Sequence, residues 1–435
     1  MLRNGRRKNN MRLCGLTPYD LFMNARTIIS LLTTTMAITW RAEAQIYDTN
    51  DDVAQVFAGS GTTGFLNAQG TLAIFNNPDG IAADSLGNLY VADVGNARIR
   101  LITTNGMVST FAGGGGGSLP GYGTAVSLPL TGGMMVADHS NTLWIVQGAG
   151  AYGGFGLVRI GTDTLVEFLS FTGVYAGTGL CVDSSNNLYY STPTQIYRLA
   201  ANGTLDVYAG SGNSGSQNGS GIYASFSGPG ALAVDEAGNI YVWDSGNYLI
   251  RRIDQNQNVT TIAGNGNNVN VDGVGTAASF RSIFSMQADD FGNLFLTCGS
   301  CIRKIDAATN VWTVAGSFTQ NSYANGAGAI ARFNGASDLC LSQGMIFVAD
   351  SGNEMIRNIS FNTAPVEING PNIGIGTYAG VTITGFVGRT YQIQASPDMT
   401  NWNTVATLLL NSSPYLWIDT SSVAGNRFYR AFLMP

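Results

Sequence analysis

Short apolar runs alternate with polar turns along most of the chain, and residues 230–264 show this pattern most clearly. Their apolar runs are rich in Val, Ile, Tyr and Trp and cover 231–234, 240–243, 248–253 and 259–263. Runs of this length and composition are typical of β-strands, and the Asp, Asn, Gly and Ser residues between them favour turns. The stretch therefore predicts an antiparallel sheet of four strands, which needs neighbouring sheets to bury its apolar faces.

The same unit recurs along the chain at intervals of 54, 45, 52, 54 and 52 residues. The units align on the residue that opens the turn after each first strand, namely Asp84, Asp138, Asp183, Asp235, Asp289 and Leu341. Six sets of first, second and third strands follow from this alignment, but only five of them are followed by a fourth strand. The missing fourth strand is Val53–Gly59, which has no unit before it. The count predicts an all-β, six-bladed propeller over residues 51–362 that the N-terminal strand closes, which removes exposed sheet edges.

The best units share the pattern GxxVDxxGNxYVADxGNxxIRxI, followed by VxTxAG. This pattern resembles the NHL-repeat propellers, most closely in the first, fourth and sixth units. The resemblance implies the propeller fold and says little about function, because the family includes scaffolds, ligand binders and a few enzymes. The connectors 58–78, 209–229, 263–280 and 315–333 also repeat. Their final Ala-x-Phe predicts an apolar anchor that packs back onto the ring.

Beyond the sixth unit the pattern changes. Residues 363–378 are a linker rich in Pro, Asn and Gly, and residues 379–435 hold several further β-prone runs. We expect a small β-sandwich-like domain here. It is similar to small C-terminal modules of secreted bacterial proteins, which implies an accessory or surface-attachment role.

The first 44 residues resemble a secretory signal peptide. A basic start precedes the apolar run 27–40, and Ala42-Glu43-Ala44 forms a cleavage site. We expect the chain to be exported to the periplasm, the cell surface or the medium of a bacterium, with no membrane span after cleavage. Residues 45–435 then hold 14 Lys+Arg against 25 Asp+Glu, a net charge of −11. That charge argues against binding to nucleic acid or to anionic membranes.

The repeated polar residues are interpreted as structural. The turn aspartates sit one per unit, which favours hydrogen bonds within each turn over a shared calcium site, and the same holds for Asp93, Asp244 and Asp350 before Gly-Asn. Arg100, Arg251, Arg303 and Arg357 occupy one position of the third strands. A ladder against turn aspartates is the favoured interpretation, and a ring of arginines facing an anionic ligand is the alternative. The single histidine, His139, lies in a turn and indicates no catalytic or metal site, and no cofactor is expected.

Two cysteines, Cys298 and Cys301, replace the usual Asp-x-Gly-Asn turn of the fifth unit. In an exported chain this C-x-x-C predicts a hairpin disulfide, with free thiols and a redox motif as the alternatives. Cys181 and Cys340 fall in first strands and are expected to be buried thiols.

Departures from the repeat supply the candidate binding site. The second unit carries an insertion at 147–156, and we expect aromatic side chains to gather there near one face of the ring. The predicted ligand-binding residues are Trp144, Tyr152, Phe155, Tyr190 and Trp243. The expected function is therefore a monomeric, non-catalytic binding or scaffold propeller for a protein partner or a glycan.

The alternative is an enzyme that resembles the gluconolactonase-like or lyase-type propellers, which hold a metal over the central channel. The inward residues of the first strands are mainly Ala, Val, Ile and Cys, with Gln287 and Asp338 as the polar exceptions. This lining argues against the enzyme, and no metal ligands are predicted.

Overall fold

The computed structural model describes residues 52–128, 130, 132, 134–147, 156–170, 178–360, 366–368, 379–383, 390–396, 400–409, 415–419 and 428–433. The predicted leader 1–44, the linker 363–378 apart from 366–368, and residues 148–155 of the predicted insertion lie outside this set. In the described part of the chain every helix is a short 3-10 turn, and the rest of the regular structure is β.

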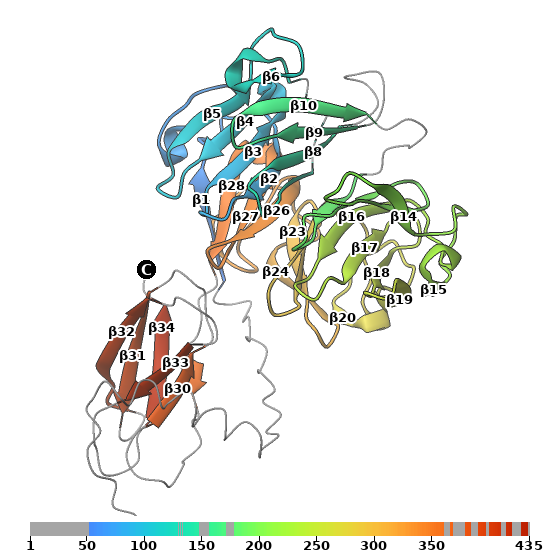
Figure 1. Cartoon of the computed structure of the whole chain (residues 1–435). Coiled ribbons are helices and arrows are strands. Elements are labelled where there is room, and N and C mark those ends of the chain that lie inside the picture. Colours follow the sequence, from blue (N-terminus) through green and yellow to red (C-terminus); the bar gives the residue numbers. More distant parts are fainter. Residues whose placement is uncertain are drawn as a thin grey trace, which may run out of the picture. The chain divides into compact units, whose positions relative to one another are not determined.

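Six antiparallel sheets of four or five strands form the blades of a propeller in the described residues 52–360 (Figure 1). Blade 1 contains β2 (Pro78–Ala83), β3 (Leu89–Asp93), β4 (Arg98–Ile102) and β5 (Val108–Gly113). Blade 2 contains β7 (Met135–Ala137), β8 (Leu143–Gln147), β9 (Gly156–Ile160), β10 (Leu165–Ser170) and the edge strand β6 (Gly121–Tyr122). Blade 3 contains β11 (Leu180–Val182), β12 (Leu188–Ser191), β13 (Ile196–Leu199) and β14 (Leu205–Ala209).

The remaining three blades each have five strands. Blade 4 contains β16 (Pro229–Val234), β17 (Ile240–Asp244), β18 (Leu249–Ile253), β19 (Asn258–Ala263) and β15 (Gly219–Ser220). Blade 5 contains β21 (Met286–Ala288), β22 (Leu294–Thr297), β23 (Cys301–Ile305), β24 (Asn310–Gly316) and β20 (Gly273–Val274). Blade 6 contains β26 (Ala336–Ser342), β27 (Met345–Asp350), β28 (Met355–Ser360), β1 (Val53–Ala58) and β25 (Gly326–Ala327).

The N-terminal strand β1 lies beside β28, the third strand of blade 6, which is the partner that the strand count predicts. The two pair antiparallel, with Val53 opposite Ser360 and Val56 opposite Arg357. A strand from one end of the repeat region therefore completes a sheet built from the other end. Short fifth strands such as β25 then cover the outer edges of four blades, which shields their unpaired backbone groups.

The sixth unit is one residue out of the register that the sequence predicts. Its first hairpin is tighter, since Ser342 pairs directly with Met345 and Leu341 pairs with Ile346. Ser342, and not Leu341, therefore stands where the other blades carry the turn aspartate. The prediction of Leu341 was wrong because a shorter turn moves the alignment by one position.

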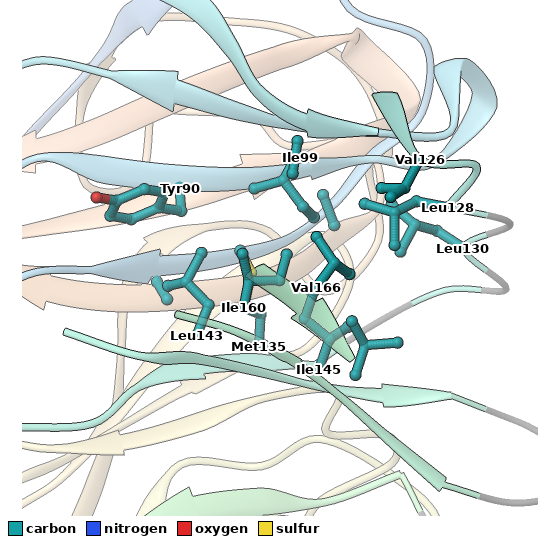
Figure 2. Close-up of a cluster of buried hydrophobic side chains, with 14 residues drawn as sticks. Tyr90, Ile99, Val126, Leu128, Leu130, Met135, Leu143, Ile145, Ile160 and Val166 are labelled. Carbon is teal, nitrogen blue, oxygen red and sulfur yellow. The ribbon is translucent and has the colours of Figure 1, made fainter. Parts of the chain in front are cut away.

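Each junction between neighbouring blades has its own apolar cluster. Between blades 1 and 2, Tyr90 and Ile99 face Leu143, Ile145 and Ile160 (Figure 2). Between blades 6 and 1, Phe347 and Ile356 pack with Ile81, Leu89 and Val91, so the junction at the ends of the repeat is packed like the others. Burial of this apolar surface is the main term that holds the ring together.

Four connectors between blades carry the predicted apolar anchors. Phe75, Phe226, Phe280 and Phe333 are 0% exposed, as are the alanines two positions before them. The 3-10 turns η1 (Gly70–Leu72), η4 (Gly221–Tyr223) and η5 (Gly275–Ala277) lie just before three of these anchors, and η3 (Gly123–Ala125) lies in the connector to blade 2. Two further turns, η2 (Val94–Asn96) and η6 (Ser351–Asn353), follow the second strands of blades 1 and 6.

The C-terminal residues form a separate two-sheet β module. One sheet has the order β29 (Val366–Ile368), β34 (Phe428–Leu433), β31 (Thr390–Ser396) and β32 (Asn403–Leu409). The other pairs β30 (Ala379–Ile383) with β33 (Tyr415–Asp419). Tyr391, Ile393, Ala395, Tyr429 and Ala431 form its buried cluster.

Candidate functional site

The turn aspartates hold their own hairpins. One carboxylate oxygen of Asp235 accepts the backbone N–H of Asn239 at 2.8 Å. The other oxygen accepts the Asn239 side-chain amide at 2.7 Å and the Tyr241 hydroxyl at 2.9 Å. In blade 2 the indole N–H of Trp144 takes the tyrosine's place on Asp138 at 2.9 Å. These carboxylates accept hydrogen bonds from donors of their own turns, which is the structural role that the sequence predicts.

Buried arginines clamp the connectors to the blades. The Arg251 guanidinium is 0% exposed and donates to the Asp244 carboxylate at 2.7 Å. It also donates to the Gln217 carbonyl at 3.1 Å and to the Asn218 side-chain oxygen at 2.8 Å. The anchor Phe226 lies against it, 5.4 Å from ring centroid to guanidinium carbon. Arg100 and Arg357 repeat this arrangement with Asp93 and Asp350. The ladder interpretation is confirmed for these three blades, and each buried guanidinium has a carboxylate partner inside the protein.

The inner strands carry one deeply buried carboxylate, Asp338 of β26. Its oxygens accept the backbone N–H of Ile81 in β2 at 2.9 Å and that of Leu339 at 2.8 Å. Burial raises the pKa of Asp338 to about 7, and the nearby Asp79 carboxylate pushes it in the same direction. The Ser337 hydroxyl donates to the Asp79 carbonyl at 2.8 Å. The Ile81–Asp338 and Ser337–Asp79 hydrogen bonds tie blade 6 to blade 1. The Asp338 carboxylate therefore takes part in holding the ring together.

Of the predicted aromatic residues that the structure describes, Trp144 and Tyr190 lie together and Trp243 lies apart from them. Tyr190 is 0% exposed and lies with Trp144 in the cluster between blades 2 and 3. Trp243 is 3% exposed and packs on Phe280 in the cluster between blades 4 and 5. Tyr152 and Phe155 lie outside the described residues. Trp144 and Tyr190 therefore share one junction, and Trp243 belongs to another.

A different set of aromatic side chains is exposed on the clamped connectors. Phe65 is 44% exposed, Tyr323 is 47% exposed and Tyr223 is 73% exposed. They lie before the buried Ala-x-Phe anchor of their connectors, inside segments that are otherwise rich in Gly, Asn and Ser. The sequence contains a signal for these residues. A large aromatic residue in a polar connector, separate from the Ala-x-Phe anchor, is expected to be exposed because the anchor already fills the core position.

The cysteines lie where the sequence predicts them. Cys298 and Cys301 lie opposite each other across the turn before β23, with their Cα atoms 5.2 Å apart, a separation that suits the predicted disulfide. Cys181 and Cys340 are buried free thiols, and burial raises the pKa of both. In the described part of the chain no group of three or more His, Cys, Asp or Glu side chains is arranged to hold a metal ion. His139 is exposed, and its backbone N–H donates to the Asn186 side chain of blade 3.

Comparison with known proteins identifies the repeat and the fold. Residues 75–100 match the NHL repeat. No curated protein sequence matches the chain. The fold is similar to a Bacteroides thetaiotaomicron protein of unknown function, 19% identical, with a TM-score of 0.56 over 71% of this chain and 76% of that one. The described residues 52–360 thus define a six-bladed β-propeller with an NHL repeat in its first blade.

Two further solved structures share this fold. An auxiliary nutrient binding protein from Bacteroides thetaiotaomicron is 17% identical, with a TM-score of 0.55 over 71% of this chain and 76% of that one. A protein of the same description from Bacteroides ovatus is 16% identical, with a TM-score of 0.54 over 72% and 77%. Among the residues that the structure describes, no helix has the length and apolar character needed to cross a membrane.

Proposed function

We propose that this chain is an exported binding propeller, without catalytic activity of its own, that recognises a protein partner or a glycan through its connectors. The observation that carries the proposal is the exposure of Phe65, Tyr223 and Tyr323 on connectors that buried arginines hold in place. Aromatic side chains on a rigid frame bind a ligand with little loss of conformational entropy.

The inner strands support a binding role over catalysis. A general acid or base must reach its substrate, whereas both oxygens of Asp338 accept backbone N–H groups of the ring and its side chain is buried. The two similar structures described as auxiliary nutrient binding proteins also support a binding role. We further propose that residues 1–44 are removed on export and that the mature chain acts as a monomer in the periplasm or at the cell surface.

The test is a binding screen with the purified chain. The chain is applied to a glycan array and, separately, used with a crosslinker on intact cells of the source bacterium. Phe65→Ala, Tyr223→Ala and Tyr323→Ala each remove an exposed ring without touching the buried anchors, so all three should fold and at least one should bind more weakly. A screen without any saturable binder, glycan or protein, contradicts the proposal.

An enzyme of the gluconolactonase or lyase type is the second candidate. The observation that favours it is the elevated pKa of Asp338, about 7, on an inner strand beside Asp79. Metal analysis of the purified protein and a panel of lactones would test it. Stoichiometric bound metal and turnover that Asp338→Asn abolishes would support the enzyme, and turnover would argue against the non-catalytic role.

A further inference from the structure

A shallow depression of about 500 Å³ lies beside the short edge strand β25, where the N-terminal strand completes blade 6. Three segments that are distant in sequence line it: β1, the turn η1 and the connector that leads into blade 6. The side chains used below are Gln55, Thr71, Tyr323 and Asn325, and Val53 and Val56 complete the apolar part of the lining.

The lining contains an aromatic ring, two amides, two hydroxyl groups and apolar carbon, and no charged side chain. Phosphate, carboxylate and cationic ligands would find no opposite charge in it. A neutral sugar has an apolar C–H face that packs on an aromatic ring, and hydroxyl groups that pair with amides. The chemistry of the lining therefore matches a neutral carbohydrate.

Tyr323 and Asn325 are held in place before any ligand arrives. Arg357 donates to the Asn325 side-chain oxygen at 3.0 Å, and its guanidinium carbon lies 5.2 Å from the centroid of the Tyr323 ring. The Asn325 amide donates to the Tyr323 hydroxyl at 3.1 Å. Arg357 is itself fixed by the buried Asp350 at 3.0 Å. Gln55 and Thr71 make no side-chain hydrogen bonds to other described residues, so their polar groups are free for a ligand.

The clamp does not require an aromatic residue at this place. In blade 4 the residue two positions before Asn218 is Ser216, and Arg251 forms the same bonds there. In blade 1 the equivalent residue is Phe65, whose ring lies 4.7 Å from the Arg100 guanidinium carbon. Of the two aromatic residues at this connector position, Phe65 and Tyr323, it is Tyr323 that lines the depression. The clamp does not explain why the residue at this position is aromatic.

We propose that this depression, named here the seam site and defined by Gln55, Thr71, Tyr323 and Asn325, binds a neutral carbohydrate. The assignment rests on the binding function proposed above and adds the ligand class and the position. The Tyr323 ring supplies the stacking surface, the Gln55 amide and the Thr71 hydroxyl bind sugar hydroxyl groups, and Asn325 holds the ring in place.

The experiment uses the full chain on an array of neutral glycans, followed by calorimetric titration with the best oligosaccharide. Tyr323→Ala and Gln55→Ala are each expected to weaken binding about tenfold or more, the loss that removal of one stacked ring or one bonded amide causes. Tyr323→Phe keeps the ring and should lose only a few-fold. Tyr122→Ala is the control, because it removes a ring that is 60% exposed on the edge strand β6 and lies outside the depression, and it should bind like the parent. Unfolding midpoints of all four variants check that they are folded.

The outcomes separate the two proposals. Neutral glycan binding that Tyr323→Ala and Gln55→Ala leave unchanged overturns the seam site and keeps the binding function. Binding restricted to a protein partner or to charged glycans also overturns the seam site alone. The absence of any binder overturns both.

Discussion

The Arg303 guanidinium donates to the Asp272 carboxylate at 2.8 Å in blade 5, where the Cys298–Cys301 turn replaces the Asp-x-Gly-Asn turn of blades 1, 4 and 6. In blades 1, 4 and 6 the carboxylate comes from the blade's own turn, and the connector supplies an asparagine at the position of Asp272. In blade 5 the partner carboxylate therefore belongs to the connector and not to the turn. The buried arginine thus keeps one carboxylate partner in each of the four clamps, which indicates that its charge must be neutralised wherever it is buried.

Substitution of Asp272 by Asn should destabilise the propeller by about 2–4 kcal/mol, because it leaves the buried Arg303 without a carboxylate partner. Asp206→Asn is the control, since it breaks a more exposed pair with Arg198 and should change stability by about 1 kcal/mol or less. Urea unfolding of both variants measures the difference. Equal losses of stability in the two variants would show that the buried Arg303 does not need the charge of Asp272.

Asp338 should make the ring less stable as the pH rises through neutrality. Burial raises the pKa of Asp338 to about 7, while an aspartate in the unfolded chain titrates near about 3.9. The folded state holds the proton more tightly, so the contribution of this group is complete below the unfolded pKa and is lost as pH rises through about 7. Asp338→Asn removes this dependence.

The measurement is the free energy of unfolding of the parent and of Asp338→Asn at pH 5 and pH 8. The variant should gain about 2–3 kcal/mol relative to the parent between these two values. Other titrating groups are common to both proteins and cancel in the comparison. If the difference in the free energy of unfolding between the two proteins is the same at pH 5 and pH 8, Asp338 is ionised in the folded protein at both pH values.

Replacement of the anchor Phe226 by Ala should destabilise the protein by about 3–5 kcal/mol, because the ring is fully buried and its removal leaves a cavity. Tyr223→Ala, three residues earlier and 73% exposed, should change stability by no more than about 0.5 kcal/mol. Limited proteolysis should then cut the connector 209–229 faster in the first variant only. Similar cleavage in both would mean that Phe226 does not anchor the connector.

A new negative charge should lower the stability of the protein at one residue of β1 and have little effect at the next. Ala54 is 0% exposed and packs in the cluster between blades 5 and 6, so Ala54→Asp buries an unpaired carboxylate and should cost about 3 kcal/mol or more. Gln55 is exposed, and Gln55→Asp should have little effect on stability. Thermal unfolding of the two variants checks the inward and outward faces of the strand. A tolerated Ala54→Asp would contradict the packing of β1 in blade 6.

Alkylation should report the state of the cysteines. Without the predicted leader 1–44, the chain contains Cys181, Cys298, Cys301 and Cys340. If Cys298 and Cys301 form a disulfide, unfolded protein without reductant should take up label only at the two buried thiols, Cys181 and Cys340. Reduction should add label at the other two, as mass spectrometry of the peptides would show. Four labelled cysteines without reductant would indicate free thiols.

Much of the blade could be predicted because its key contacts are local. Asp235 is bonded to residues four and six positions along the chain, so the spacing in the sequence already contains the turn. The Ala-x-Phe anchors could be predicted for a similar reason, since an apolar pair at the end of a polar connector has nowhere to go except the core. The strand that completes blade 6 followed from counting, since one fourth strand was missing.

The candidate site could not be predicted in the same way. Tyr190 and Trp243 look like ligand-binding aromatics in the sequence, and the packing of neighbouring blades buries them in separate clusters. Likewise, a hairpin shortened by one residue puts Ser342 where the repeat predicts Leu341.

The turns could be predicted from the amino-acid sequence because their hydrogen bonds join residues a few positions apart, and the number of blades because the repeats can be counted. The contacts between side chains across the ring become visible only in the folded protein. Asp338 accepts the N–H of Ile81 across a separation of 257 residues, and Gln55 of the first strand lines the same depression as Tyr323 near the end of the repeat region. Such contacts depend on how six sheets close around one axis, and no local spacing records that geometry.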